Sequence, residues 1–433
     1  TASNPFGSDV VGDRQLIVAE LPGAFLGVFT GSVERNAALT PGPAGTTVGL
    51  GGRIDLTTTK TGTYSGKVLL GTSTYSFKGA LDTDESSPNQ ATVTVAVKRG
   101  KLPSLTLSFT LDATDDLLKM GTLTDGIDTA MVSGWRNKWV KTLANPVPAG
   151  DYQGYYTFGL DIPLSLVGTA ANEGIPQGSG FGSFTVSGAT AKLNIAGRLA
   201  DGTAYTSATF VGPTGQLLIF RTLYAANARG SILGTMNITL APSNLDNTVG
   251  NNPGDLDWWR PATPGTTARL YKNGFDPLTQ NAAGSRYTAP VPPSIVMNIT
   301  NVPAGVTNAR LSFVEAFIND AQGTNFLDVN VSSTHRVTPV SSVFPRVTSM
   351  TIVARTGALT AKSILADPHP DLANGGLPAT VKRTASGLGM IVRDGAGIQG
   401  IGYFLLQKLP ATKAEPATKT DILSGQFQFD KLR

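Results

Sequence analysis

The sequence feature that most constrains the fold is an internal repeat. Three segments share a turn glycine, a short run of small residues and a lysine: TGTYSGK (Thr61–Lys67), SGATAK (Ser187–Lys192) and TGALTAK (Thr356–Lys362). Each is followed, at a similar separation, by a glycine before an aromatic strand: VSGWRNKW (Val132–Trp139), PGDLDWW (Pro253–Trp259) and LSGQFQF (Leu423–Phe429). Self-similarity at a steady period indicates repeated structural units. We therefore predict that the 433 residues form three diverged copies of one unit.

Between these landmarks, apolar and polar residues alternate in short runs such as Ala91–Lys98 (ATVTVAVK) and Ser104–Leu111 (SLTLSFTL). A period of two is typical of β-strands, and 50 glycines and 27 prolines disfavour long helices. Asp201-Gly202 is a hairpin signal between two such runs. We predict an all-β fold of three antiparallel meander units, each a small β-barrel or β-sandwich. The barrel is preferred because closure removes exposed strand edges.

Proline-rich stretches and the repeat landmarks define the predicted boundaries. Residues 1–20 are an N-terminal extension, 21–145 the first β-unit, 146–263 the second and 351–433 the third. Residues 264–350 are a linker or insertion, for which we predict a small sheet of its own with strands at Ser294–Ile299 and Ala309–Phe313.

The composition favours an exported β-protein. Charged residues make up 15% of the chain, well below the roughly 25% of ordinary soluble domains, so neutral polar residues must cover much of the surface. The net charge of +4 and the lack of a dense Lys/Arg stripe exclude the electrostatic footprint of a nucleic-acid binder. With no cysteine, disulfides and thiolate metal sites are excluded. No apolar run approaches the roughly 18 residues of a membrane helix. We expect that any signal peptide has been removed.

Several further motifs point to one kind of protein. They are the TG-x-(Tyr/Leu)-x-(Gly/Ala)-Lys repeat, GRLADGT (Gly197–Thr203), GSILG (Gly230–Gly234), WW-x-P at Trp258, YKNGF (Tyr271–Phe275), GSRY (Gly284–Tyr287) and GIGYFLL (Gly400–Leu406). Over most of Leu21–Phe429 the chain resembles the repeats of large secreted or surface β-proteins of Verrucomicrobia-type bacteria. The resemblance implies export and surface display, and it transfers no catalytic residue because these motifs are turn glycines and aromatics.

Residues suited to catalysis or metal binding are sparse. The two histidines, His335 and His369, lie in no metal-ligating or triad-like signature. Asp367-Pro-His369-Pro-Asp371 is interpreted as an extended loop. Carboxylates crowd three loops: Asp82, Asp84 and Glu85; Asp115 and Asp116; and Asp246, Asp255 and Asp257. Such loops suit Ca²⁺, but without an EF-hand pattern we interpret them as solvated turns. We predict no catalytic residue, no metal site, no cofactor and no enzymatic activity.

The four tryptophans, Trp135, Trp139, Trp258 and Trp259, all lie in the predicted closing strands. Their rings could stack on sugars as a ligand-binding platform. Recurrence at one position of the unit favours a packing role instead, either in a core or between units.

One candidate assembly segment precedes the first unit. Leu16, Ile17 and Val18 lie in an apolar, strand-prone stretch (QLIVA, Gln15–Ala19). Such a strand can add to an exposed sheet edge of a second copy.

Taken together, these features predict an extracellular or cell-surface structural or adhesive protein, such as a self-assembling filament or surface-layer subunit. Its partner would be further copies of the chain, in a homo-oligomer or polymer, or surface glycans. The alternative is an array of carbohydrate-binding modules. Electrostatics give no reason to expect nucleic acid as a partner.

Overall fold

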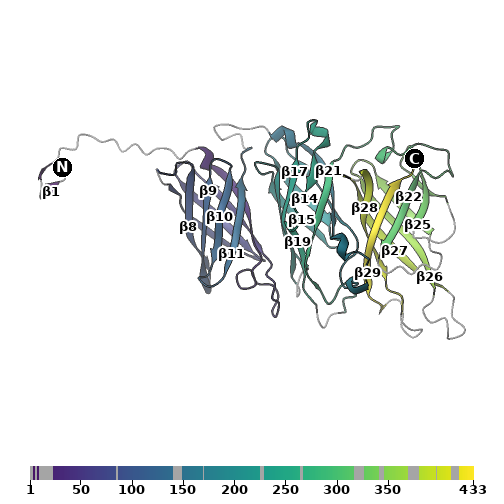
Figure 1. The fold of residues 1–433 in the computed structure, drawn as a ribbon, viewed down its shortest axis with the longest axis horizontal. Helices are drawn as coiled ribbons and strands as arrows, with labels where there is room; N and C mark the ends of the chain where they lie inside the picture. The colour runs from purple at the N-terminus through teal and green to yellow at the C-terminus, as the bar shows by residue number, and fades with distance from the viewer. Residues whose placement is uncertain are drawn as a thin grey trace.

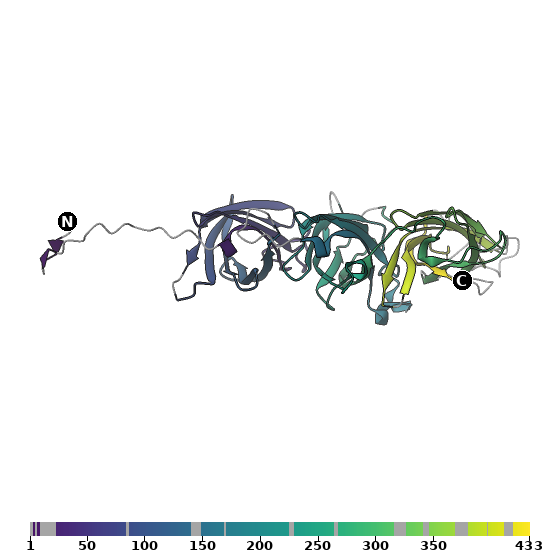
Figure 2. The ribbon, with the colours of Figure 1, turned by 90° about the horizontal axis from the view of Figure 1, so that it is seen from above.

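The computed structural model describes residues 3–4, 7–8, 23–83, 86–139, 149–168, 170–224, 229–263, 267–315, 326–340, 346–368, 380–395, 397–410 and 419–433. The strands of this part of the chain form three antiparallel sheets that stand side by side in a row (Figure 1). Seen from above, each of the three sheets is curled, and the three lie in a row (Figure 2). A two-stranded ribbon of β1 (Ser3–Asn4) and β2 (Gly7–Ser8) precedes them. The predicted all-β fold of three antiparallel units is confirmed.

The first sheet has the strand order β6-β5-β4-β3-β11-β10-β9-β8-β7. Its strands are β3 (Gly27–Val33), β4 (Gly52–Thr58), β5 (Thr63–Leu70), β6 (Ser73–Ala80), β7 (Asp82–Thr83), β8 (Gln90–Arg99), β9 (Leu102–Asp112), β10 (Leu117–Thr124) and β11 (Thr129–Arg136). Leu81 alone separates the two edge strands, β6 and β7, in sequence. The edges therefore meet, and the sheet is a nearly closed barrel.

The second sheet has the order β15-β14-β13-β12-β21-β18-β17-β19-β20, with β16 also paired to β17. Its strands are β12 (Gly154–Asp161), β13 (Gly180–Val186), β14 (Lys192–Arg198), β15 (Ala204–Phe210), β16 (Gln216–Leu223), β17 (Gly230–Thr239), β18 (Thr248–Gly250), β19 (Leu256–Arg260), β20 (Phe275–Thr279) and β21 (Asn281–Arg286). The Ser207 hydroxyl joins β15 to β16 by donating to the Leu218 carbonyl and accepting from the Phe220 N–H, both at 3.3 Å. This second barrel is also nearly closed.

The third sheet has the order β24-β23-β22-β29-β28-β27-β26-β25. Its strands are β22 (Ala309–Glu315), β23 (Phe326–Val331), β24 (Val337–Pro339), β25 (Arg346–Val353), β26 (Ala358–Pro368), β27 (Thr380–Asp394), β28 (Gly397–Gln407) and β29 (Ile422–Lys431). No ladder joins β24 to β25 within the described ranges, so this sheet stays open. The helices of the described chain are single 3-10 turns: η1 (Gly23–Phe25), η2 (Ala149–Tyr152), η3 (Leu164–Leu166), η4 (Ala170–Asn172), η5 (Asn244–Asp246) and η6 (Val296–Asn298).

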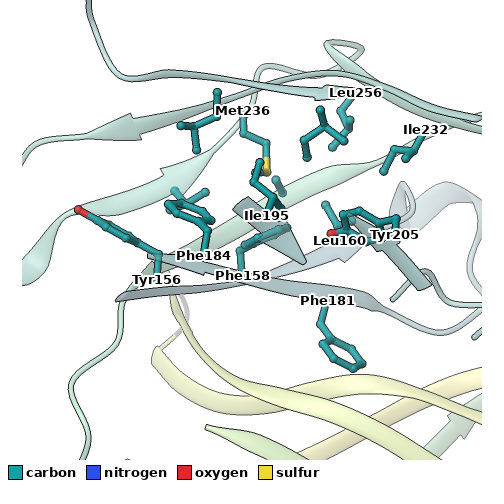
Figure 3. Packing of buried hydrophobic residues seen from close by; sticks show 14 of the residues in the cluster. Tyr156, Phe158, Leu160, Phe181, Phe184, Ile195, Tyr205, Ile232, Met236 and Leu256 are labelled. Carbon is teal, nitrogen blue, oxygen red and sulfur yellow. The ribbon is translucent and has the colours of Figure 1, made fainter. Parts of the chain in front are cut away.

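Alternation along the strands produces the cores. In β8, Ala91, Val93 and Val97 are buried while Thr92 and Thr94 face solvent, as the two-residue period of a strand requires. Figure 3 shows the same principle in the second barrel, where Tyr156, Phe158 and Leu160 share a packed interior. Phe181, by contrast, points out of that interior toward the third sheet. The barrels thus carry apolar groups on the outside wherever a neighbouring sheet covers them.

The strand pairings revise the predicted organisation of 264–350. No separate small sheet forms there among the described residues. Instead, β20 and β21 complete the second barrel, where β21 pairs with β12, while β22 and β23 belong to the third sheet. The predicted strand at Ser294–Ile299 is wrong, because η6 forms at Val296–Asn298 and its flanking apolar residues pack into the third core.

The repeat landmarks correspond only in part. Lys67 lies in β5 and Lys192 begins β14, and each of these is the third strand from the start of its meander. Lys362 lies in β26, which is three strands from the last strand, β29, and on the opposite side of it from the first strand, β22, so its predicted equivalence is wrong. Glycine at the turn before the strand is shared by the first and third copies, since Gly62 and Gly357 both have φ of 75°, a conformation that favours glycine.

The predicted closing strand of the second unit is also wrong. PGDLDWW forms β19, which pairs with β17 and β20 rather than with the first strand of its barrel. The strand that closes the second barrel is β21, which contains Gly284. In the other two sheets, Gly134 and Gly425 lie in the last strand, β11 and β29 respectively, and that strand pairs with the first strand of its sheet.

Candidate functional site

The first junction, between the first and second barrels, centres on the guanidinium group of Arg35. Its Nε donates to Asp257 at 2.6 Å, and its other nitrogens donate to Ser231 Oγ at 2.5 Å and to the carbonyls of Gly49 and Leu50 at 3.1 and 3.2 Å. The Arg35 side chain is 10% exposed and Asp257 29%. One planar guanidinium group thus bonds both to β17 and β19 of the second barrel and to the loop before β4 of the first barrel.

Three of the four tryptophans lie at the same junction. Trp135 packs with Phe210 and Leu218 of the second barrel. Trp139 enters the second core, where its ring meets Tyr152 edge-on at 5.4 Å and its Nε1 donates to the Val211 carbonyl at 2.7 Å. Trp259 lies so close to Gly42 of the first unit that a Cβ on this glycine would overlap its ring.

Trp258 is enclosed in the second barrel, and all four rings are at most 5% exposed. No indole face is therefore open to a sugar. We infer that these residues pack the structure rather than bind a ligand.

The second junction, between the second barrel and the third sheet, is built from buried backbone and hydroxyl groups. Thr157 donates to the Ile391 carbonyl at 2.8 Å, and the Ser424 hydroxyl donates to the Ala200 carbonyl at 2.5 Å. The Ser424 N–H in turn donates to the hydroxyl of Tyr271 at 2.8 Å. Such buried hydrogen bonds are costly to break, because a buried donor or acceptor without a partner has lost its bonds to water and gains nothing in return.

Apolar side chains of the third sheet also pack against the outer wall of the second barrel. Met390 and Val392 of β27 and Ile401 and Tyr403 of β28 belong to the same buried cluster as the interior of the second barrel. Tyr403 stacks on Phe181 with ring centroids 6.1 Å apart. The buried cluster of the second barrel therefore extends into the third sheet, which also has a separate core of its own.

A buried polar network lies near this junction. Arg260 pairs with Asp201 at 2.5 Å and donates to the Leu270 carbonyl at 2.6 Å. The hydroxyl of Tyr224 donates to Asp201 at 2.8 Å and accepts from Trp258 Nε1 at 2.9 Å. Burial, together with the charge of Asp201, raises the pKa of Tyr224 well above its ordinary value. The phenol is therefore fixed in its neutral form, and the network suits structural support better than proton transfer.

The predicted histidine and assembly residues give little to a site. Nε2 of His335 accepts a hydrogen bond from the Val296 N–H at 3.2 Å, and burial lowers its pKa. His335 thereby holds η6 in place. His369 and the assembly residues Leu16, Ile17 and Val18 lie outside the described residues.

The acidic loops pair with cations or polar groups. Asp115 contacts Lys119, Asp116 contacts Arg136, and Asp246 contacts Arg393. Asp255 accepts from the Asn252 side chain at 2.9 Å, while Asp84 and Glu85 fall outside the described ranges. Within the parts of the chain described, no group of three or more His, Cys, Asp or Glu side chains could hold a metal ion.

Asp112 gives a pH-dependent prediction. Hydrogen bonds from the Thr114 hydroxyl and N–H, at 2.6 and 2.9 Å, lower the pKa of Asp112 to about 2. Since the folded pKa is depressed, the stabilisation is full above the unfolded pKa near 3.9 and is lost as pH falls through about 2. Asp112→Asn should lower the free energy of unfolding by about 2 kcal/mol at pH 7, and the deficit should vanish near pH 2.

Denaturant titrations at pH 7 and at low pH measure this difference. The exposed Asp82→Asn is the control, with an expected change within about 0.5 kcal/mol. A deficit that persisted undiminished at low pH would contradict the assignment.

Four cavities complete the inventory of candidate sites. The first, of 450 Å³, lies at the mouth of the first barrel beside the first junction. The second, of 480 Å³, lies between the second barrel and the third sheet. The third, of 450 Å³, is a polar groove over β16, β17 and β18, and the fourth, of 490 Å³, lies on the first barrel around Gly66. None is lined by Asp201, Tyr224 or Arg260, so the buried network meets none of these cavities.

The residues that join the units carry no distinctive signal in the sequence. The sequence around Arg35, Ser231 and Ser424 is ordinary and polar. These residues join the units only because they bond to partners roughly 150 to 220 residues away in the sequence. A weak cue was available for the tryptophans, because recurrence of aromatics at one position favoured packing between units.

Comparison with known proteins yields one weak likeness. No protein-family model matches the chain, and no curated protein matches it significantly. Among solved structures, the chain resembles the crystal structure of isotype 1 transferrin binding protein B from serogroup B Neisseria meningitidis, with 11% identity and a TM-score of 0.24. The match covers 94% of this chain and 76% of the Neisseria chain. A TM-score this low carries no argument about function. No helix within the described ranges is long and apolar enough to cross a membrane.

Proposed function

We propose that the chain is a rigid structural or adhesive element of an extracellular surface. The observation that carries the proposal is the sharing of cores and buried hydrogen bonds across both junctions, exemplified by Trp139 within the second core and by Tyr403 stacked on Phe181. Flexibly linked binding domains meet through smaller, more polar contacts. Two barrels and one open sheet, joined in a row by these junctions, suit a spacer or subunit that must keep its shape.

The surface and the sequence resemblance support the extracellular setting. Neutral polar side chains hold three of the five exposed positions of β8, at Gln90, Thr92 and Thr94. The proposed partner is a further copy of the chain, with Leu16, Ile17 and Val18 as the predicted connector. A carbohydrate-binding array built on the tryptophans has less support because their rings are buried.

Breaking the first junction tests rigidity. Arg35→Ala removes the donor to Asp257, Ser231 and two carbonyls, which should weaken the junction by about 1 to 3 kcal/mol. Amide exchange in the loop before β4 and in β17 should then accelerate by roughly tenfold or more. Small-angle scattering should change from a rigid elongated particle to a flexible one.

Arg310→Ala is the matched control, since Arg310 pairs with Asp328 inside the third sheet and away from both junctions. An Arg35→Ala protein as rigid as the Arg310→Ala protein would contradict the proposal. Electron microscopy of the purified chain tests the assembly part: ordered polymers support it, and single particles at every concentration count against it.

A further inference from the structure

The cavity at the mouth of the first barrel has the features of a binding site. Its floor is apolar, formed by the buried side chains Leu39, Leu50 and Leu70. Its rim combines Tyr75 with the hydroxyl groups of Thr72 and Ser73. A volume of 450 Å³ falls within the range of small-molecule sites, which favour barrel mouths and domain interfaces. This cavity lies at both, because Arg229 of the second unit forms part of its wall.

Two arginines converge on the cavity from different units. Arg99 ends β8 and uses its Nε to donate to the Pro103 carbonyl at 2.7 Å. Arg229 precedes β17 and donates from one terminal nitrogen to the Thr72 hydroxyl at 3.1 Å. Among the described residues neither forms an ion pair with a carboxylate. Hydrogen bonds from the Asp128 and Ile127 N–H groups of its own turn lower the pKa of the nearby Asp125, and the positive charge of Arg99 adds a smaller lowering.

The other three cavities lack this charge pattern. The second is lined by Arg286 and Arg393, and Arg393 is paired with Asp246, which also lines the wall. The third contains Asp255 and no cation, and the fourth is lined by the carboxylate of Asp55 as well as by Lys67 and Lys78. Only the first of the four has cationic side chains and no carboxylate in its lining.

We propose that this cavity binds an acidic saccharide, one whose sugar ring carries a carboxylate or sulfate group. Each guanidinium keeps donors for a planar or tetrahedral anion. The ring of Tyr75 and the apolar floor offer a surface for the non-polar face of a sugar, and Thr72 and Ser73 offer partners for its hydroxyls. The inference goes beyond the scaffold role, because a rigid row of barrels needs no ligand.

Calorimetric titration of the full chain tests the proposal with trigalacturonic acid and, in a second arm, galactose 6-sulfate. The fully methyl-esterified trigalacturonate is the matched neutral probe. We expect at least one of the two acidic probes to bind, and the tighter binder shows whether the site prefers a carboxylate or a sulfate. The methyl ester should bind roughly tenfold more weakly or worse. Arg99→Gln and Arg229→Gln should each weaken acid binding by roughly tenfold or more.

Arg336→Gln is the control for the loss of one positive charge, because Arg336 is exposed in the third sheet and far from the cavity in the fold. It should bind the acidic probe like the unaltered chain. Four results would each overturn the proposal. They are equal binding of the ester, unchanged binding by both cavity variants, tighter binding of hexaglutamate than of either acidic sugar, and no binding of either acidic sugar. Circular dichroism of the variants establishes that they are folded, which is expected since Arg229 is exposed and Arg99 half-buried.

Discussion

Replacing Trp258 with alanine is expected to lower the free energy of unfolding of the second barrel by about 3 to 5 kcal/mol. The indole is fully buried and packs edge-on against Phe275, with ring centroids 4.8 Å apart. Its Nε1 also supplies one of the hydrogen bonds of the Tyr224 hydroxyl. Alanine would leave a cavity in a close-packed core and remove that donor, so two separate losses add.

Hydrogen exchange measured strand by strand checks this result, because a chain of three sheets need not unfold in one step. Protection should fall in β17 and β19, which pair around Trp258. The control is Ile127→Ala, in a turn of the first sheet where the side chain is 92% exposed; its effect should stay within about 0.5 kcal/mol. Unchanged protection of β17 and β19 in the Trp258 variant would refute the packing role.

Asp201→Asn is expected to cost about 3 to 5 kcal/mol, because it leaves the guanidinium of Arg260 buried without a counter-charge. The Asp201 side chain is 0% exposed and that of Arg260 10%. The Nε of Arg260 has no hydrogen-bond partner within the described structure, so water does little to compensate. The loss should appear in the second barrel and, through Tyr224, in the packing of Trp258.

Asp328→Asn is the matched control for the loss of an ion pair. Asp328 also accepts from an arginine, Arg310, at 2.8 Å, but both side chains are about one-third exposed (33% and 34%). Solvated pairs of this kind contribute less than about 1 kcal/mol. Denaturant titration of the two variants therefore separates the effect of burial from that of pairing. Equal losses in the free energy of unfolding would contradict the prediction that burial makes the Asp201–Arg260 pair the more important one.

Local patterns in the sequence predicted the strands well. Alternation in segments such as Ala91–Lys98 follows from burial on one face of a strand, which depends only on neighbours in the chain. The repeat pattern placed Gly134 and Gly425 in the last strand of their sheets, where each lies against the backbone of the first strand, but it missed Gly284. A Cβ on Gly284 would collide with the backbone of Thr157 and Phe158. The pattern pointed to Gly254 instead, because Trp258 and Trp259 follow it. Those tryptophans, however, pack in the second core and at the first junction.

Pairing between distant segments could not be predicted. β21 pairs with β12, more than one hundred residues earlier, and β22 pairs with β29, a similar distance later. A strand's partner is chosen by packing of the whole sheet, so 264–350 looked like an insertion although its strands complete two units. The arginines of the first-barrel cavity were missed for the same reason, since Arg99 and Arg229 meet only when two units come together.

The shared core of the middle barrel has a consequence for how the protein is made. All strands of the first barrel lie within residues 27–136, so it can close as soon as that stretch leaves the ribosome. The second barrel needs β21 to close, and Met390, Val392, Ile401 and Tyr403 of the third sheet then cover apolar groups on its outer wall. Domains usually mature in order from the N-terminus during synthesis. Here the outer wall of the middle unit stays uncovered until the last unit has been made, so we expect aggregation to compete with folding most strongly in that interval.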